Sequence, residues 1–212
     1  MSKDTITKEV LETDSTVQVG KEINWVDKQC AETVYCTPDY LAKALRDYYG
    51  GEIPFDAATL ASNPLEAVKF CTEKQDGLLT PWEPRTFVNP PYGEEISAWT
   101  EKIHLEAAGQ REVIALLPCG ARFSTNYWQW DILASELDVI LFVKGRVGFL
   151  DARGEQRKQN PYDSAFYGFN VDVRRFCACM GHLGKIVIVA GVYYRPDKNP
   201  LKRRLADRYA AT

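Results

Sequence analysis

The tetrapeptide Asn89-Pro90-Pro91-Tyr92 combines residue types that can hold an aromatic ring carrying an amino group. The lone pair of such an amino group is delocalised into the ring, so the group is a poor nucleophile until acceptors bind both of its hydrogens. The side-chain carbonyl of Asn89 and the main-chain carbonyl of Pro90 can be these two acceptors. Pro91 holds the residue before it extended, and Tyr92 offers a ring on which a base can stack. The pattern predicts a site for chemistry on an exocyclic amino group.

This tetrapeptide lies between a predicted strand and a predicted helix. The apolar run Thr86-Phe87-Val88 precedes it, and two consecutive prolines cannot continue a strand ladder. Apolar residues at Ile96, Trp99, Ile103 and Ala107 then follow helical spacing. A position in the folded core argues against an exposed peptide-ligand motif and leaves a purely structural turn as the alternative.

A second strand end carries a carboxylate. The segment EIPFDAAT (52–59) is predicted to be a short apolar strand that ends at Asp56 and is followed by small residues. The helix before it has clear boundaries in the sequence. Thr37 suits its N-cap, Pro38 its first helical position, and Gly50-Gly51 its end.

The alternation of apolar strands with amphipathic helices predicts an α/β fold, with a mainly parallel, twisted sheet covered by helices on both faces. Further strands are expected in the apolar runs at 112–118, 138–146, 163–171 and 184–194, and a further helix at 125–136. Ligands of such folds bind beyond the carboxyl ends of the strands. Asp56 and Asn89 both occupy such ends.

Several motifs occur in an order that matches a known family. They are YCTPDYLAKAL, FDAAT, DGLLTPW, FVNPPYG, IALLP, KGRVGF and NPYDSAFYGF. Between about Tyr35 and Phe169 the chain therefore resembles the phage-type DNA N6-adenine methyltransferase family, part of the larger class of S-adenosylmethionine-dependent amino-methyltransferases. The resemblance implies a Rossmann-like methyltransferase fold and methyl transfer to the N6 amino group of adenine in DNA.

The resemblance also implies roles for individual residues. Asn89 and Pro90 would accept hydrogen bonds from the adenine amino group, with Pro91 stiffening the loop and Tyr92 stacking on the base. Because that amino group lies inside a duplex, the base would be flipped out of the helix. The methyl group would pass directly from the sulfonium, without a covalent enzyme intermediate.

The cofactor implied by the resemblance is S-adenosylmethionine. Asp56, preceded by Phe55, would be the carboxylate of its pocket; Thr37 and Pro38 would lie beside it, and Asp76 would face the cofactor as well. The chain departs from many nucleotide-binding proteins in having no Gly-x-Gly loop here, so the pocket depends on Asp56 and its small neighbours. No metal is expected in the reaction.

Composition limits the class of protein. The 212 residues are 45% hydrophobic and 26% charged with a formal net charge of −3, which is typical of a globular protein and argues against one that coats nucleic acid. Local contact with DNA remains compatible with this charge. Basic residues gather in two segments: Arg153, Arg157 and Lys158 in the first, and Lys198, Lys202, Arg203, Arg204 and Arg208 in the second. The loop 146–161 is a candidate for target specificity.

Three regions are expected along the chain: a polar, loosely ordered segment at 1–24, a methyltransferase domain at 25–196, and a basic tail or helix at 197–212. The polar N-terminus and the short apolar runs predict no membrane partner and a cytoplasmic protein, in the host cytoplasm if a phage encodes it. For a phage-type enzyme, protection against restriction is a plausible purpose.

Cysteine-containing motifs suggest other chemistries, and each has an argument against it. Pro118-Cys119 resembles the start of a cytosine C5-methyltransferase nucleophile, but the partner motif around a glutamate is absent. The pair Cys177-x-Cys179 lacks the usual zinc spacing, and reduced thiols are the default for a chain of this kind. Amino-methylation of cytosine N4, RNA adenine or protein glutamine stays open, as does a catalytically silent relative that binds nucleic acid.

Overall fold

The structure is a computed structural model that describes residues 35–120, 124–133, 136–156 and 162–189. Several predictions fall outside these ranges: the N-terminal segment 1–24, the basic segment 197–212, and Arg157 and Lys158 of the candidate specificity loop. Within the described ranges, no helix combines the length and the apolar character needed to cross a membrane.

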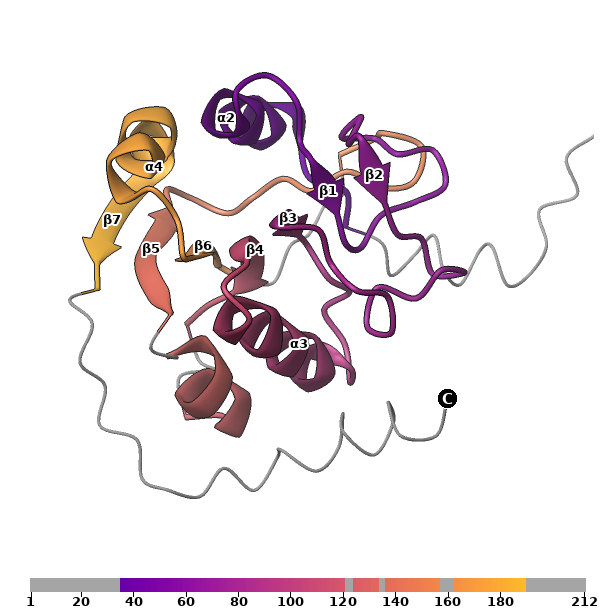
Figure 1. Cartoon of the computed structure of the whole chain (residues 1–212). Helices are drawn as coiled ribbons and strands as arrows, with labels where there is room; N and C mark the ends of the chain where they lie inside the picture. The colour runs from indigo at the N-terminus through magenta and orange to yellow at the C-terminus, as the bar shows by residue number, and fades with distance from the viewer. Residues whose placement is uncertain (1–34, 121–123, 134–135, 157–161, 190–212) are drawn as a thin grey trace, which may run out of the picture.

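A sheet of seven strands forms the centre of the described structure (Figure 1). Its order is β2-β1-β3-β4-β6-β5-β7. The strands are β1 (Phe55–Asp56), β2 (Lys69–Phe70), β3 (Arg85–Val88), β4 (Glu112–Pro118), β5 (Leu137–Val143), β6 (Ser164–Phe169) and β7 (Gly184–Ile188).

The prediction of a mainly parallel sheet requires correction, because the sheet is mixed. The pairings among β1, β2, β3 and β4 are parallel, whereas β6 is antiparallel to both β4 and β5, and β7 is antiparallel to β5. Every residue of β6 (SAFYGF) is buried, so its sequence lacks the alternation of apolar and polar residues that is typical of a half-exposed antiparallel strand. An apolar run indicates burial on both faces and does not indicate strand direction.

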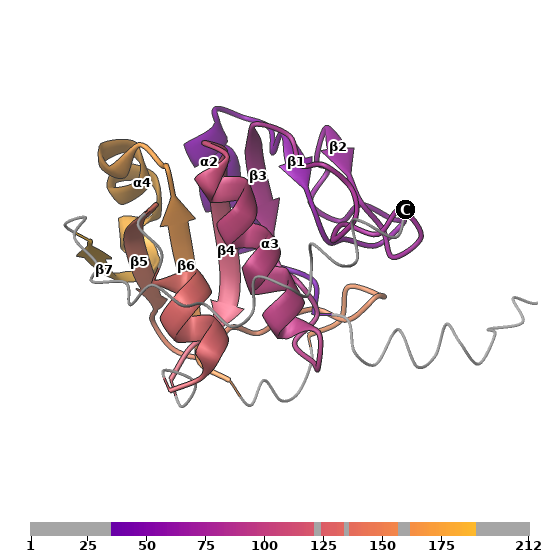
Figure 2. The same cartoon turned by 60° about the horizontal axis from the view of Figure 1, so that its bottom comes forward.

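Helices cover both faces of the sheet, as predicted (Figures 1 and 2). One face packs against α2 (Asp39–Tyr49) and α4 (Val173–Met180), and the other against α3 (Ile96–Ala108) and the π-helical segment η1 (Trp128–Ile132). Alternate residues of β4 divide between these layers, since successive side chains of a strand point to opposite faces. A short 3₁₀ helix, η2 (Gly181–Leu183), leads from α4 into β7.

The two ends of α2 differ in how well the sequence predicted them. Gly50 ends the helix as expected, with a left-handed φ of 97° and its N–H donating to Arg46 O. At the start, however, Pro38 is the N-cap and Asp39 the first helical residue, so Thr37 lies one position further out. The Thr37 hydroxyl is not used as a cap, because it accepts a hydrogen bond from Asn89.

The topology creates a crevice between β1 and β3. The chain leaves β1 toward β2 on one side and then crosses to β3 on the other side. At such a switch point the loops after the two strands diverge, and ligands of open α/β sheets bind there. Asp56 ends β1 and Asn89 follows β3, so the two residues meet at this point.

Candidate active site

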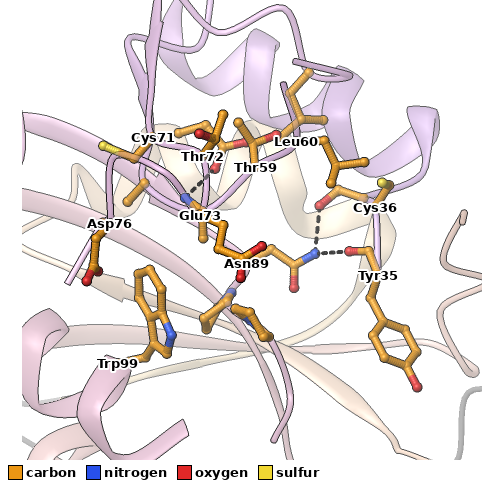
Figure 3. Close-up of a pocket in the computed structure, with 18 of the residues that line it drawn as sticks. Tyr35, Cys36, Thr59, Leu60, Cys71, Thr72, Glu73, Asp76, Asn89 and Trp99 are labelled. Atoms are coloured by element: carbon orange, nitrogen blue, oxygen red, sulfur yellow. Dashed lines mark hydrogen bonds between the residues drawn. The ribbon is translucent and has the colours of Figure 1, made fainter. Parts of the chain in front are cut away.

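A cavity of about 750 Å³ lies at the switch point, within the size range of small-molecule sites (Figure 3). Six of the predicted site residues line it: Thr37, Asp56, Asp76, Asn89, Pro90 and Pro91. The other three, Pro38, Phe55 and Tyr92, are not in its lining. Pro38 is buried at the start of α2, and Phe55 is buried in the core behind Asp56.

Two hydrogen bonds fix the side chain of Asn89. Its Nδ2 donates to the main-chain oxygen of Tyr35 at 2.7 Å and to Thr37 Oγ1 at 3.1 Å. The amide nitrogen is therefore committed to the segment before α2, which determines the position of the amide oxygen. That oxygen, Oδ1, is buried and has no hydrogen-bond partner in the part of the chain that the structure describes. The site thus holds a fixed acceptor at the position where the sequence predicts one.

Tyr92 belongs to an aromatic cluster beside the cavity. Its hydroxyl donates to Leu116 O at 3.1 Å, which anchors the ring to β4. Its ring stacks on Tyr35, with centroids 5.7 Å apart, and makes edge contacts with Phe149 and Tyr162. The predicted stacking platform is therefore part of a larger aromatic surface that also includes a residue of the cavity lining.

Asp56 is almost fully buried, with 2% of its surface exposed. Desolvation raises the pKa of this carboxyl to about 7, although hydrogen bonds from the Ala58 N–H and the Thr59 side chain act in the opposite direction. A buried carboxylate without a paired cation is costly. The surroundings of Asp56 therefore favour binding of a positively charged group.

Asp76 and Gly77 form a turn that lines the cavity. Asp76 has a positive φ of 56°, and its Oδ1 accepts a hydrogen bond from the Leu78 N–H at 2.9 Å. Gly77 packs so closely on the loop after β1 that a Cβ atom there would overlap the carbonyl oxygen of Ala57. Glycine is required at this position because the two loops touch through their backbones.

The described part of the candidate specificity loop lies beside the site. Leu150 pairs with Cys36 through two backbone hydrogen bonds, of 2.8 and 2.9 Å. Asp151 stabilises the turn that follows, since its Oδ1 accepts from the N–H groups of Arg153 and Glu155. Through Leu150 and Phe149, the loop contacts the segment that holds Asn89.

The sequence interpretation missed several residues of the lining, among them Tyr35, Thr59, Cys71, Glu73 and Trp99. Glu73 follows the carboxyl end of β2 by three residues, but the sequence predicts no strand there, because β2 is only two residues long and is not buried. The sequence places Trp99 in the apolar spacing of a helix and gives no sign that it faces a cavity. Trp99 is indeed 6% exposed, but its ring also lines the cavity.

A second cavity, lined by Cys119 and Arg146 among others, lies at the ends of β4 and β5. Burial, and secondarily the charge of Asp163, raises the pKa of the Cys119 thiol. A thiol with a raised pKa is a poor nucleophile at neutral pH. The raised pKa of this thiol does not favour a cytosine C5 mechanism at Cys119.

The α/β sheet and its cavity at the switch point are consistent with the methyltransferase class of folds. A family model described as DNA N-6-adenine-methyltransferase (Dam) matches residues 27–172, about two thirds of the chain. The chain therefore belongs to the DNA N-6-adenine-methyltransferase (Dam) family, which confirms the resemblance seen in the sequence. No curated protein matches the chain.

Proposed function

We propose that this protein transfers a methyl group from S-adenosylmethionine to the N6 amino group of adenine in DNA. Membership of the Dam family supports the reaction and the substrate. The observation that carries the proposal is the Asn89 side chain, whose nitrogen is bound twice and whose oxygen is a buried acceptor with no partner in the described structure. A buried acceptor without a partner is costly to the fold, so a ligand donor is the natural reason to keep it.

In this proposal Asn89 and Pro90 act on the target amino group. The amide oxygen of Asn89 and the carbonyl of Pro90 accept its two hydrogens, which localises the nitrogen lone pair for attack. Because Asn89 is already held in place by Tyr35 and Thr37, no reorganisation is needed when the base arrives. Fixed groups of this kind contribute through positioning and electrostatics.

The residues of the cavity fit S-adenosylmethionine. The cofactor carries two positive charges on its amino-acid half, for which the desolvated carboxylate of Asp56 is suited. Thr37 and Asp76 line the same space, and Trp99 supplies an aromatic ring to it. When bound, the cofactor would supply a methyl group on its sulfonium sulfur. Transfer would form the N–C bond as the C–S bond breaks, leave the electron pair on sulfur and release one amino proton to water.

DNA would approach the aromatic cluster beside the cavity. A base in a duplex must leave the stack to reach Asn89, and Tyr92 offers a ring to receive it. The loop that carries Arg153 is tied to Cys36 next to this cluster, so it is the described segment best placed to contact the target strand. We assign target contacts to this loop.

Cytosine N4, RNA adenine and protein glutamine present the same amino chemistry and remain alternative substrates. The family match favours DNA adenine among them. The intact and fixed Asn89 argues against a catalytically silent relative, because a silent protein gains nothing from a buried acceptor without a partner.

The test is methyl transfer to unmethylated DNA by the wild type and by Asn89→Ala, with the nucleosides identified by mass spectrometry. We expect N6-methyladenine from the wild type and a loss of about 100-fold or more in the variant, which is typical for removal of one fixed transition-state contact. Binding of S-adenosylhomocysteine, followed by calorimetry, should persist in the variant.

Other products have distinct meanings. N4-methylcytosine would keep the chemistry and change the base. Binding of the cofactor product without methylation of DNA would direct the search to RNA or protein. Absence of both binding and methylation in the wild type would contradict the proposed enzyme.

A further inference from the structure

Trp99 presents a buried hydrogen-bond donor at the cavity. It lies in the second turn of α3, is 6% exposed, and contributes to the lining. Its indole Nε1 is buried and has no hydrogen-bond partner within the described ranges. Buried donors are almost always bonded, because an unbonded one loses its hydration without compensation.

A second tryptophan at the same place shows what a purely structural indole does here. Trp82 is 3% exposed, and its Nε1 donates to the main-chain oxygen of Gly77 at 2.8 Å. Both rings pack at the Asp76-Gly77 turn. The indole N–H of Trp82 is bonded to the protein, whereas that of Trp99 has no partner among the described residues. The N–H of Trp99 is therefore available to donate a hydrogen bond to a ligand.

The Trp99 ring has a defined position relative to the cavity. A Cβ atom on Gly77 would lie 2.9 Å from Trp99 Cη2, so the ring and the bare turn are in close contact. Figure 3 shows the ring beside Asp76, on the opposite side of Asn89 from Tyr35. The donor is therefore at the part of the cavity lined by Asp76 and Gly77, on the other side of Asn89 from Tyr35.

The surroundings of Trp99 suit a flat heterocycle. Trp99 supplies an aromatic ring, Gly77 and Leu78 supply small or apolar surface, and the neighbouring Asp76 supplies a carboxylate that can accept a hydrogen bond from an amino or hydroxyl group. The carboxylate of Asp56 lines the same cavity and suits the cationic amino-acid half of the cofactor. The nucleoside half carries ring nitrogens and ribose oxygens that accept hydrogen bonds.

We propose that Trp99 binds the nucleoside half of S-adenosylmethionine, with its indole N–H donating to an acceptor on that half. This assignment rests on the proposed function, because it takes S-adenosylmethionine as the ligand. It adds a specificity-determining residue that the sequence placed in the hydrophobic core. The ring contributes surface for the heterocycle, and the N–H selects an oriented acceptor.

Calorimetry with two probes tests the assignment. S-adenosylhomocysteine contains both halves of the ligand, and 5′-methylthioadenosine contains only the nucleoside half. For Trp99→Phe we expect affinity for both probes to fall about tenfold, as for loss of one buried hydrogen bond and part of a ring contact. For the matched control Trp128→Phe we expect affinities within about twofold of the wild type, because Trp128 is a buried tryptophan of η1 that does not line this cavity.

A second variant distinguishes loss of the hydrogen bond from a defect in folding. Replacement of Trp99 by benzothienylalanine keeps the shape of the ring and removes only the N–H, so the same direction of change is expected with a normal thermal unfolding profile.

The outcomes separate the two proposals. Unchanged affinities in both Trp99 variants would overturn this assignment and leave the proposed function intact. Weaker binding of S-adenosylhomocysteine with unchanged binding of 5′-methylthioadenosine would also overturn it, since the donor would then serve the amino-acid half. If the wild type bound neither probe, the use of S-adenosylmethionine would be refuted, and the Trp99 assignment with it.

Discussion

The orientation of the Asn89 side chain is fixed by residues that are far away in the sequence. An asparagine amide can rotate to present either its oxygen or its nitrogen. Here Tyr35 O and Thr37 Oγ1 both accept from Nδ2, and only one orientation satisfies them. The direction of the acceptor is thus determined by the segment before α2, more than fifty residues earlier in the chain.

A substitution at Thr37 tests this at the scale of the residue. Thr37→Val keeps the shape of the side chain and removes the hydroxyl, so the Asn89 amide loses one of its two restraints. We expect the rate of methyl transfer at saturating substrate to fall about five- to tenfold, corresponding to about 1 kcal/mol. Thr37→Ser, which retains the hydroxyl, should keep most of the activity. Equal losses in both variants would show that the hydroxyl does not act through Asn89.

Asp56 gives a prediction for pH. Its pKa of about 7 in the ligand-free protein means that it is partly protonated near neutrality. A cationic ligand favours the ionised form, so binding lowers this pKa, and affinity for S-adenosylmethionine should increase as pH rises from 6 to 8 and then level off.

The nearby Cys71 and Tyr49 have raised pKa values and stay neutral over this range. Calorimetry at several pH values measures the trend, and Asp56→Asn should abolish it. A flat wild-type profile would contradict the assigned role.

At the scale of the element, the turn after β2 matters as much as the strand ends. The Asp76-Gly77 turn bridges the loop after β1 and helix α3, since Gly77 touches both Ala57 and Trp99. Trp82 adds a hydrogen bond to the carbonyl of Gly77. The part of the cavity lined by Asp76 and Gly77 is therefore built by contacts among the loop after β1, the segment between β2 and β3, and helix α3. None of these elements would form it alone.

Substitution of Gly77 tests whether the Asp76-Gly77 turn shapes the ligand site. In Gly77→Ala the added methyl group would overlap a backbone oxygen that cannot move easily, so the turn must shift. We expect a loss of stability of about 1–3 kcal/mol, as for overpacking, and a loss of S-adenosylhomocysteine affinity of tenfold or more.

The matched control is Gly181→Ala in η2, where the added Cβ would lie 3.8 Å from Ile186 Cδ1, an ordinary van der Waals contact. This variant should bind the probe normally. Urea unfolding and calorimetry measure both effects, and wild-type binding by Gly77→Ala would show that the turn does not shape the site.

At the scale of the whole molecule, the cavity joins separate stretches of chain. Its lining comes from the segment before α2, the loops after β1, β2 and β3, and the start of α3. A ligand there binds only when all of these are assembled. Ligand binding and folding are consequently coupled through mass action.

This coupling predicts a change in melting temperature. At S-adenosylhomocysteine concentrations about 100 times the Kd, the folded state should gain about 2.7 kcal/mol, which corresponds to a rise of about 5–10 °C for a domain of this size. Thermal unfolding followed by circular dichroism measures the shift. Asp56→Asn and Trp99→Phe should reduce it, and an unchanged melting temperature in the wild type would argue against binding at this cavity.

The sequence by itself determined the local features. The types of residue in Asn89-Pro90-Pro91-Tyr92 specified an acceptor and a stacking ring, because those properties belong to single side chains and a stiff loop. Helical spacing located α3, and Gly50 located the end of α2, because periodicity and capping act within a few residues. The family followed from the same motifs in their order.

Only the tertiary structure decided the rest. Strand direction in β6 depends on its neighbours, which an apolar sequence does not identify. The restraint of Asn89 by Thr37 joins positions 52 residues apart, and the two tryptophans differ in that Trp82 donates to the Gly77 carbonyl whereas Trp99 Nε1 has no partner among the described residues. These features are pairwise contacts across the fold, and a residue type or a spacing cannot specify them before the chain has brought the partners together.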